Sequence, residues 1–153
     1  MRRTIIGVIG SGECSKEIAT TAMEVGREIA RKGGLLLCGG LGGVMEAACK
    51  GAKEEGGITI GILPGDNTDE ANRYIDIPIV TGIGYARNII IAKSSDILIA
   101  VSGGYGTLSE IAFGLTLNKR IISIGSWELD ESIIRVSTPK EAVEKAFGIL
   151  SEV

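Results

Sequence analysis

Apolar and polar positions alternate regularly along the chain: short apolar runs are separated by longer segments in which apolar residues recur at helical spacing. This order predicts an α/β fold, a Rossmann-like doubly wound parallel sheet of five to six or more strands with helices on both faces. The expected strands are residues 4–9, 35–38, 58–64, 77–80, 96–101 and 120–124. The expected helices are residues 16–32, 44–55, 85–94, 106–117 and 139–150.

The ends of some elements carry recognisable signals. Thr138, Pro139 and Glu141 combine a capping box with proline at the first helical position, which predicts the start of the last helix. Residues 64–74 are polar and turn-rich, and we expect a surface loop over the strand ends. No linker or low-complexity tract divides the chain, so residues 1–153 are expected to form one nucleotide-binding domain.

Composition narrows the function classes. The net charge is −3 and the basic residues are scattered, so no basic patch for nucleic acid is expected. Charged residues interrupt every apolar run before it is long enough to span a membrane. We therefore expect a cytoplasmic protein. The chain has no histidine, and its three cysteines lack CxxC spacing, so neither imidazole chemistry nor a metal site is expected.

A doubly wound sheet binds its ligand in a crevice at the carboxyl ends of the strands. The loops that should form this crevice follow the strands at 4–9, 35–38 and 96–101, and all three are rich in glycine. Ser11 and Gly12 lie in the first loop and are candidate ligand-binding residues.

The second and third loops resemble each other. GGLGGVMEAA (39–48) and GGYGTLSEIA (103–112) share the pattern GGxGxxxE, and each lies between a strand and a helix. Glycines let peptide N–H groups approach an anion, and the helix behind adds partial positive charge, so a phosphate is the expected ligand. The candidate phosphate-binding residues are Gly39, Gly40, Gly42, Gly43, Gly103, Gly104, Gly106 and Thr107. The alternative is that strand-to-helix turns simply favour glycine.

Four further side chains have expected roles. Glu110 lies about one turn into its helix, where its carboxylate can point along the crevice or merely complement the helix dipole, and Glu46 is its counterpart. Tyr105 is expected either to stack on a base or to pack at the mouth of the pocket. Trp127 is expected to be an exposed loop or subunit-contact aromatic.

Several motifs are absent. The first loop lacks the third glycine of a dinucleotide fingerprint, and the strand at 35–38 does not end in an acidic residue, so NAD is not expected. No P-loop and no GxSxG occur, which excludes those routes to ATP hydrolysis and acyl transfer.

The segment RNIIIAKSSDILIAVSGGYGTLSE (87–110) resembles the signature of the Lonely Guy (LOG) family, often labelled lysine decarboxylase-like. That signature is an arginine, an aspartate nine residues later, an apolar strand and PGGxGTxxE. The matching residues are Arg87, Asp96, Gly103, Gly104, Gly106, Thr107 and Glu110. No lysine is marked for pyridoxal phosphate, so amino-acid decarboxylation is not expected.

The resemblance implies hydrolysis of the N-glycosidic bond of a nucleoside 5′-monophosphate, with Arg87 and Glu110 as the catalytic pair and the GGYGT turn as the phosphate site. No cofactor is then required. The alternative is a related branch of similar chain length, the molybdenum cofactor carrier proteins, which bind a phosphorylated pterin without hydrolysing it. The ligand is thus a nucleoside monophosphate or a pterin phosphate, and the family resemblance implies a homodimer or larger homo-oligomer.

Two positions depart from the LOG signature. Ser102 replaces its proline, and Asn88 replaces the lysine that commonly follows the arginine, which makes Asn88 a further candidate site residue.

Overall fold

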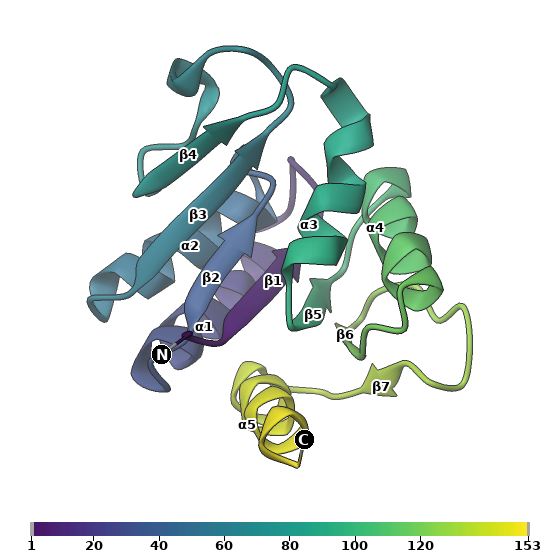
Figure 1. Ribbon diagram of the computed structural model, residues 1–153. Helices are drawn as coiled ribbons and strands as arrows, with labels where there is room; N and C mark the ends of the chain where they lie inside the picture. The colour runs from purple at the N-terminus through teal and green to yellow at the C-terminus, as the bar shows by residue number, and fades with distance from the viewer. Residues whose placement is uncertain (1, 153) are drawn as a thin grey trace.

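The computed structural model describes residues 2–152 and contains a seven-stranded sheet in which every pairing is parallel (Figure 1). The strands are β1 (Ile5–Ile9), β2 (Leu35–Cys38), β3 (Ile58–Leu63), β4 (Ile77–Val80), β5 (Ile97–Val101), β6 (Ile121–Ile124) and β7 (Ile134–Arg135). Their order is β4-β3-β2-β1-β5-β6-β7. The predicted Rossmann-like α/β fold is confirmed, and the two-residue strand β7 was not predicted.

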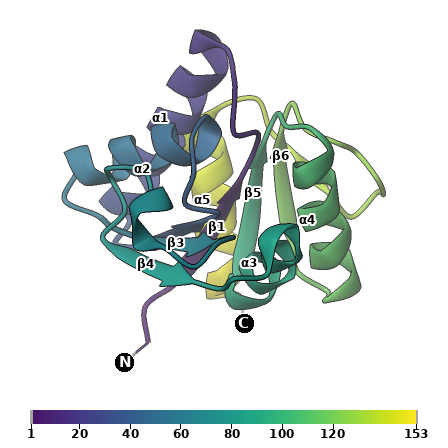
Figure 2. The ribbon, with the colours of Figure 1, turned by 90° about the horizontal axis from the view of Figure 1, so that it is seen from above.

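Helices cover both faces of the sheet (Figure 2). They are α1 (Lys16–Arg31), α2 (Val44–Glu54), α3 (Asn88–Ser94), α4 (Tyr105–Thr116) and α5 (Pro139–Ser151). Two 3₁₀ turns are η1 (Thr68–Glu70) and η2 (Gly84–Arg87). One hydrophobic cluster joins the sheet to α1, α2 and α5, and a second joins it to α3 and α4. No helix within residues 2–152 is long and apolar enough to cross a membrane.

The central strands are buried on both faces, which explains their unbroken apolar sequences. Along β5, for example, Ile97 and Ile99 face the cluster with α1, whereas Leu98 and Ala100 face the cluster with α3 and α4. Most of the core therefore lies in two apolar layers, one on each side of β1 and β5.

Helices α1 and α2 pack closely against each other. A Cβ added at Gly26 would overlap the Ala48 carbonyl oxygen, so only glycine allows this approach. Ion pairs join the two helices, with the shortest N–O distances in Arg27–Glu54 (2.7 Å) and Arg31–Glu55 (3.0 Å).

The N-termini of the helices differ in how they are capped. The side chains of Ser15 and Thr138 cap α1 and α5, which confirms the capping predicted at Thr138. The N-cap residues of α2 and α4 are instead Gly43 and Gly104, which have no capping side chain. The first amides of α2 and α4 must therefore be satisfied by another part of the chain or by a ligand.

The expected helix at 85–94 begins with the 3₁₀ turn η2, and α3 starts only at Asn88. Strand order reverses between β1 and β5, since β2 lies beyond one and β6 beyond the other. The loops that follow β1 and β5 consequently meet at this switch point, where doubly wound sheets bind their ligands.

Candidate functional site

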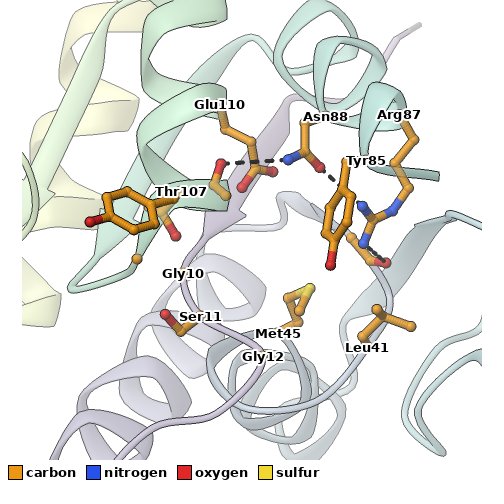
Figure 3. Close-up of a pocket in the computed structure, with 14 residues that line it drawn as sticks. Gly10, Ser11, Gly12, Leu41, Met45, Tyr85, Arg87, Asn88, Thr107 and Glu110 are labelled. Carbon is orange, nitrogen blue, oxygen red and sulfur yellow. Dashed lines mark hydrogen bonds between the residues drawn. The ribbon is translucent and has the colours of Figure 1, made fainter.

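A cavity of about 320 Å³ opens at this switch point (Figure 3). Its volume is in the range of small-molecule sites. It is lined by residues from the loops after β1, β2 and β5 and from α2, η2, α3 and α4. The lining residues are Gly10, Ser11, Gly12, Gly39, Leu41, Met45, Tyr85, Arg87, Asn88, Gly104, Tyr105, Gly106, Thr107 and Glu110.

The structure brings together most of the candidate residues. Ten of the fourteen lining positions were candidates from the sequence, and the four that were missed are Gly10, Leu41, Met45 and Tyr85. Two signals were available in the sequence: Tyr85 precedes Arg87 by two residues, and Leu41 and Met45 lie within the segment 39–48. The candidates that lie outside the lining are Gly40, Gly42, Gly43, Gly103 and Glu46.

Packing accounts for the glycines of the GGLGG turn (residues 39–43). Gly40 has φ +80° and Gly43 φ +60°, and a Cβ added at Gly43 would overlap the Ser11 carbonyl oxygen. That oxygen accepts the N–H of Val44, the first amide of α2, at 3.0 Å. The turn at the start of α2 is therefore closed by the loop after β1, and a phosphate cannot take that amide.

In the SGGYG turn (residues 102–106), by contrast, the first amide of the following helix is not bonded to another part of the described chain. The peptide N–H groups of residues 103–107 donate to no acceptor within residues 2–152. Thr107 is 2% exposed, and its Oγ1 has no hydrogen-bond partner in the described chain. Ser11 lies opposite, with its Oγ 3.5 Å from the position of a Cβ on Gly104. Amides and hydroxyls thus converge on one end of the cavity without a protein acceptor.

Arg87 is buried and is held by neutral acceptors. Its Nε donates to the Ile62 carbonyl oxygen (2.7 Å), and its Nη2 donates to the Gly39 carbonyl oxygen (3.2 Å), at the ends of β3 and β2. A Cβ added at Gly39 would approach this guanidinium to 2.9 Å. Burial lowers the pKa of Arg87, although the nearby Glu110 opposes this, and the guanidinium stays charged. Arg87 is 5% exposed and forms no salt bridge with a carboxylate within residues 2–152.

Asn88 links Arg87 to helix α4 (Figure 3). Its Oδ1 accepts from Arg87 Nη1 at 3.1 Å, and its Nδ2 lies 3.5 Å from the Gly106 carbonyl oxygen. The same Nδ2 donates to Ser109 Oγ at 3.1 Å. A lysine at this position could not accept a hydrogen bond from the guanidinium. Asn88 therefore sets the distance between the arginine and the first turn of α4.

The Glu110 carboxyl points into the cavity between Thr107 and Asn88 (Figure 3). It is 7% exposed, and it forms neither an ion pair with Arg87 nor a hydrogen bond to any residue in the described part of the chain. Burial raises the pKa of Glu110 to about 8, even though Arg87 favours the ionised form. Glu110 is thus mostly protonated at neutral pH, and its O–H can serve as a donor.

The other end of the cavity is more apolar. Leu41 and Met45 lie on one side of it and Tyr85 on another, away from Thr107 and Ser11 (Figure 3). Tyr85 is 87% exposed, so its ring has few protein contacts of its own. Such surfaces suit a flat ring system.

The cysteines take no part in this lining. Cys38 and Cys49 are buried in the core with their sulfurs 3.6 Å apart, and Cys14 is half-buried outside the cavity. Between residues 2 and 152 no three His, Cys, Asp or Glu residues are grouped as metal ligands would be.

The sequence profile of the SLOG cluster4 family matches residues 3–148. The chain belongs to this family. The family is related to the LOG phosphoribohydrolases and the molybdenum cofactor carrier proteins, so the resemblance recognised at residues 87–110 is confirmed.

Two solved structures are similar over almost their whole length. A molybdenum cofactor binding protein from Rippkaea orientalis is 41% identical, with a TM-score of 0.93 over 98% of this chain and 99% of that chain. The molybdenum cofactor carrier protein of Chlamydomonas reinhardtii is 40% identical, with a TM-score of 0.91 over the same shares.

A relative among the enzymes is more distant. The cytokinin riboside 5′-monophosphate phosphoribohydrolase of Mycobacterium tuberculosis is 34% identical over 121 residues, which are 72% of this chain and 64% of the enzyme. This chain therefore matches less than two thirds of the length of that enzyme.

Ser102 marks a local difference from the LOG signature. Its φ is +51°, and its N–H donates to the Ile124 carbonyl oxygen at 3.0 Å. Proline has a fixed negative φ and no N–H, so it could not occupy this position without a change in the turn.

Proposed function

We propose that this protein binds a pterin that carries a phosphate group, as a carrier of the molybdenum cofactor. The observation that carries the proposal is the set of unengaged donors at one end of the cavity: the amides of residues 103–107 and the buried, unpartnered Thr107 hydroxyl. A phosphate supplies several acceptor oxygens to such a set, and the positive end of α4 favours its charge.

The choice of a pterin rests on two supports. The two similar structures of molybdenum cofactor proteins match nearly the full chain at about 40% identity, whereas the similar enzyme is covered only in part. In addition, the apolar end of the cavity, with Leu41, Met45 and Tyr85, fits a flat heterocycle attached to the phosphate.

The state of Glu110 agrees with a phosphorylated ligand. An ionised carboxylate beside a phosphate dianion would weaken binding by repulsion. With its pKa raised to about 8, Glu110 instead presents a neutral carboxyl at pH 7. Its O–H can donate to a ring carbonyl or ring nitrogen of the ligand.

The proposal is tested by direct loading. Molybdenum cofactor released anaerobically from a molybdoenzyme is incubated with the protein, and the mixture is separated by gel filtration. We expect molybdenum and pterin to co-elute with the protein at a 1:1 ratio to the chain. Cofactor treated with phosphatase serves as the matched control and should be retained much less. Elution of the protein without pterin or molybdenum would contradict the proposal.

A second candidate is a phosphoribohydrolase that acts on nucleoside 5′-monophosphates. The observation that favours it is that Arg87 and Glu110, the catalytic pair of the LOG signature, both line the cavity. Cleavage of an N-glycosidic bond develops positive charge on the sugar, which an ionised carboxylate would stabilise while it orients water. The raised pKa of Glu110 would move this activity above neutral pH.

This candidate predicts release of adenine from AMP, with a rate that rises between pH 7 and 9. Chromatography of the free base measures it, and Glu110→Gln should abolish release while AMP still binds. If the wild-type protein releases no base from any nucleoside monophosphate across this pH range, the hydrolase assignment fails and the carrier assignment is unaffected.

A further inference from the structure

The segment 124–127, which starts at the last residue of β6, forms three hydrogen bonds with the SGGYG turn. We call this segment the 124–127 strap. Ser126 Oγ donates to the Ser102 carbonyl oxygen (2.5 Å), and Trp127 Nε1 donates to the Gly104 carbonyl oxygen (3.0 Å). The third bond is the one from Ser102 N–H to the Ile124 carbonyl oxygen. Neither Ser126 nor Trp127 lines the cavity.

These contacts help to orient two peptide groups; the Gly104 carbonyl also accepts from Leu108 N–H of α4 at 3.0 Å. In a trans peptide, the C=O of one residue and the N–H of the next point in opposite directions. Because the Ser102 and Gly104 carbonyls are held toward the strap, the N–H groups of Gly103 and Tyr105 point away from it. The cavity lies on that opposite side, since Gly104, Tyr105 and Gly106 line it and the strap does not.

The turn needs such support because of its own conformation. Ser102 has φ +51°, a left-handed conformation that is unfavourable for a residue with a side chain. Its N–H and C=O are both bonded to the strap, which holds the residue in this conformation.

The strap also positions the aromatic ring at the cavity mouth. Tyr105 and Trp127 stack with ring centroids 6.2 Å apart and an interplanar angle of 26°. Tyr105 is 83% exposed, and the indole covers one side of its ring. The same residue, Trp127, therefore holds both a carbonyl and a side chain of the turn.

We propose that Ser126 and Trp127 are positioning residues for the anion site: they hold the SGGYG turn so that its amides face the phosphate of the ligand. The buried, unpartnered Thr107 hydroxyl at the same end of the cavity is the independent sign that a ligand belongs there. The inference rests on the phosphate end of the proposed function but not on the identity of the ring.

The test separates binding of the phosphate from binding of the ring. Calorimetry compares 6-hydroxymethylpterin monophosphate with 6-hydroxymethylpterin, in wild type, Ser126→Ala and Trp127→Phe. Phenylalanine keeps a stacking ring but removes the indole N–H. Each variant should lose about fivefold in affinity for the phosphorylated compound, the loss expected for one hydrogen bond, and little for the other. Equal losses for both compounds, or none, would overturn the proposal.

Two controls keep the result interpretable. Ser132→Ala removes a hydroxyl from the same loop that bonds to Asp130 instead of the turn, and it should bind as wild type does. Trp127 is the single tryptophan, so its fluorescence reports phosphate binding in wild type and Ser126→Ala even if Trp127→Phe folds poorly.

Binding of inorganic phosphate tests the role of the strap separately from the proposed function. If wild type binds phosphate but neither pterin compound, the proposed function fails, and the affinity of Ser126→Ala for phosphate still decides the role of the strap. An unchanged phosphate affinity in Ser126→Ala would then overturn it.

Discussion

The GGLGG and SGGYG turns share a sequence pattern and a place in the fold, yet they differ in the direction of their hydrogen bonds. Each joins a buried strand to a helix that starts at a glycine N-cap. In the GGLGG turn the first helix amide, Val44 N–H, is bonded to Ser11, and Asn72 donates to the carbonyls of Gly40 and Leu41. The first amide of α2 and two carbonyls of that turn are therefore taken by the protein, whereas the N–H groups of residues 41–43 have no acceptor within residues 2–152.

In the SGGYG turn Ser126 and Trp127 donate to the carbonyls of Ser102 and Gly104, and the N–H groups of residues 103–107 donate to no acceptor within residues 2–152. The comparison teaches that GGxGxxxE by itself specifies a tight strand-to-helix turn. Whether the turn binds an anion depends on which neighbours take its amides.

The first prediction breaks the closed turn and has the largest effect. Gly43→Ala should lower the free energy of unfolding by about 3 kcal/mol, because the residue has φ +60° and its Cβ would overlap the Ser11 carbonyl. Gly56→Ala is the matched control, since Gly56 has φ +72° with nothing within 4 Å, and should cost about 1 kcal/mol. Urea unfolding measures both. Equal losses would mean that the contact with Ser11 is unimportant.

The second prediction compares the two corresponding carboxylates, Glu110 and Glu46. Between pH 4.5 and 8 the folded protein keeps a proton on Glu110 that the unfolded chain releases. Wild-type stability should therefore fall as pH rises through this window, relative to Glu110→Gln, by up to about 1.4 kcal/mol per pH unit. Thermal unfolding from pH 4 to 9 tests this, with Glu46→Gln measured beside it as the corresponding substitution on α2. Parallel profiles for wild type and Glu110→Gln would contradict it.

The third prediction concerns the unpartnered hydroxyl of the open turn. Thr107→Val keeps the shape of the side chain and removes a buried oxygen without a partner, so the unliganded protein should gain about 1 kcal/mol. Affinity for the phosphorylated pterin should fall about fivefold, since one donor is lost. Thr116→Val, later on the same helix, is the control for ligand affinity because its hydroxyl bonds to Ala112. A loss of stability without a loss of affinity would mean that Thr107 serves packing alone.

The fourth prediction has the smallest effect on folding. Gly104→Ala places a Cβ 3.5 Å from Ser11 Oγ, an ordinary contact, at φ −103°. Stability should change by no more than about 0.5 kcal/mol, but the methyl group enters the anion end of the cavity and should weaken ligand binding. Unfolding and calorimetry on one sample check both, and strong destabilisation would show that this turn is as tightly packed as the other.

The sequence was sufficient for six of the seven strands and for the five helices, because the buried parallel strands are continuous apolar runs and the helices have clear periodicity. It missed the two-residue strand β7 and the 3₁₀ turn η2 that precedes α3. It also placed Arg87 and Glu110 in one cavity, since both belong to a compact signature. It did not distinguish the two glycine turns. That distinction depends on Ser11 reaching Val44 and on Trp127 reaching Gly104, contacts that arise only when β1, β5 and β6 lie side by side.

Trp127 illustrates the limit most clearly. In the sequence it stands in a polar loop far from any motif, and exposure or a subunit contact was the natural interpretation. The structure confirms that it is an exposed loop residue, at 36% exposure, but also shows its bond to the glycine turn 23 residues earlier, which was not predicted. Its role follows from the pairing of β5 with β6, which no local pattern encodes.

The ion pairs that join α1 and α2 have a consequence for heat resistance. The desolvation penalty of an ion pair falls as the temperature rises. The network of Arg27, Arg31 and their glutamates should therefore contribute a larger share of the stability at high temperature. The SGGYG turn is held by hydrogen bonds from Ser126 and Trp127 and by no ion pair within residues 2–152. On heating, we expect the cavity to lose its shape before the paired helices behind it separate.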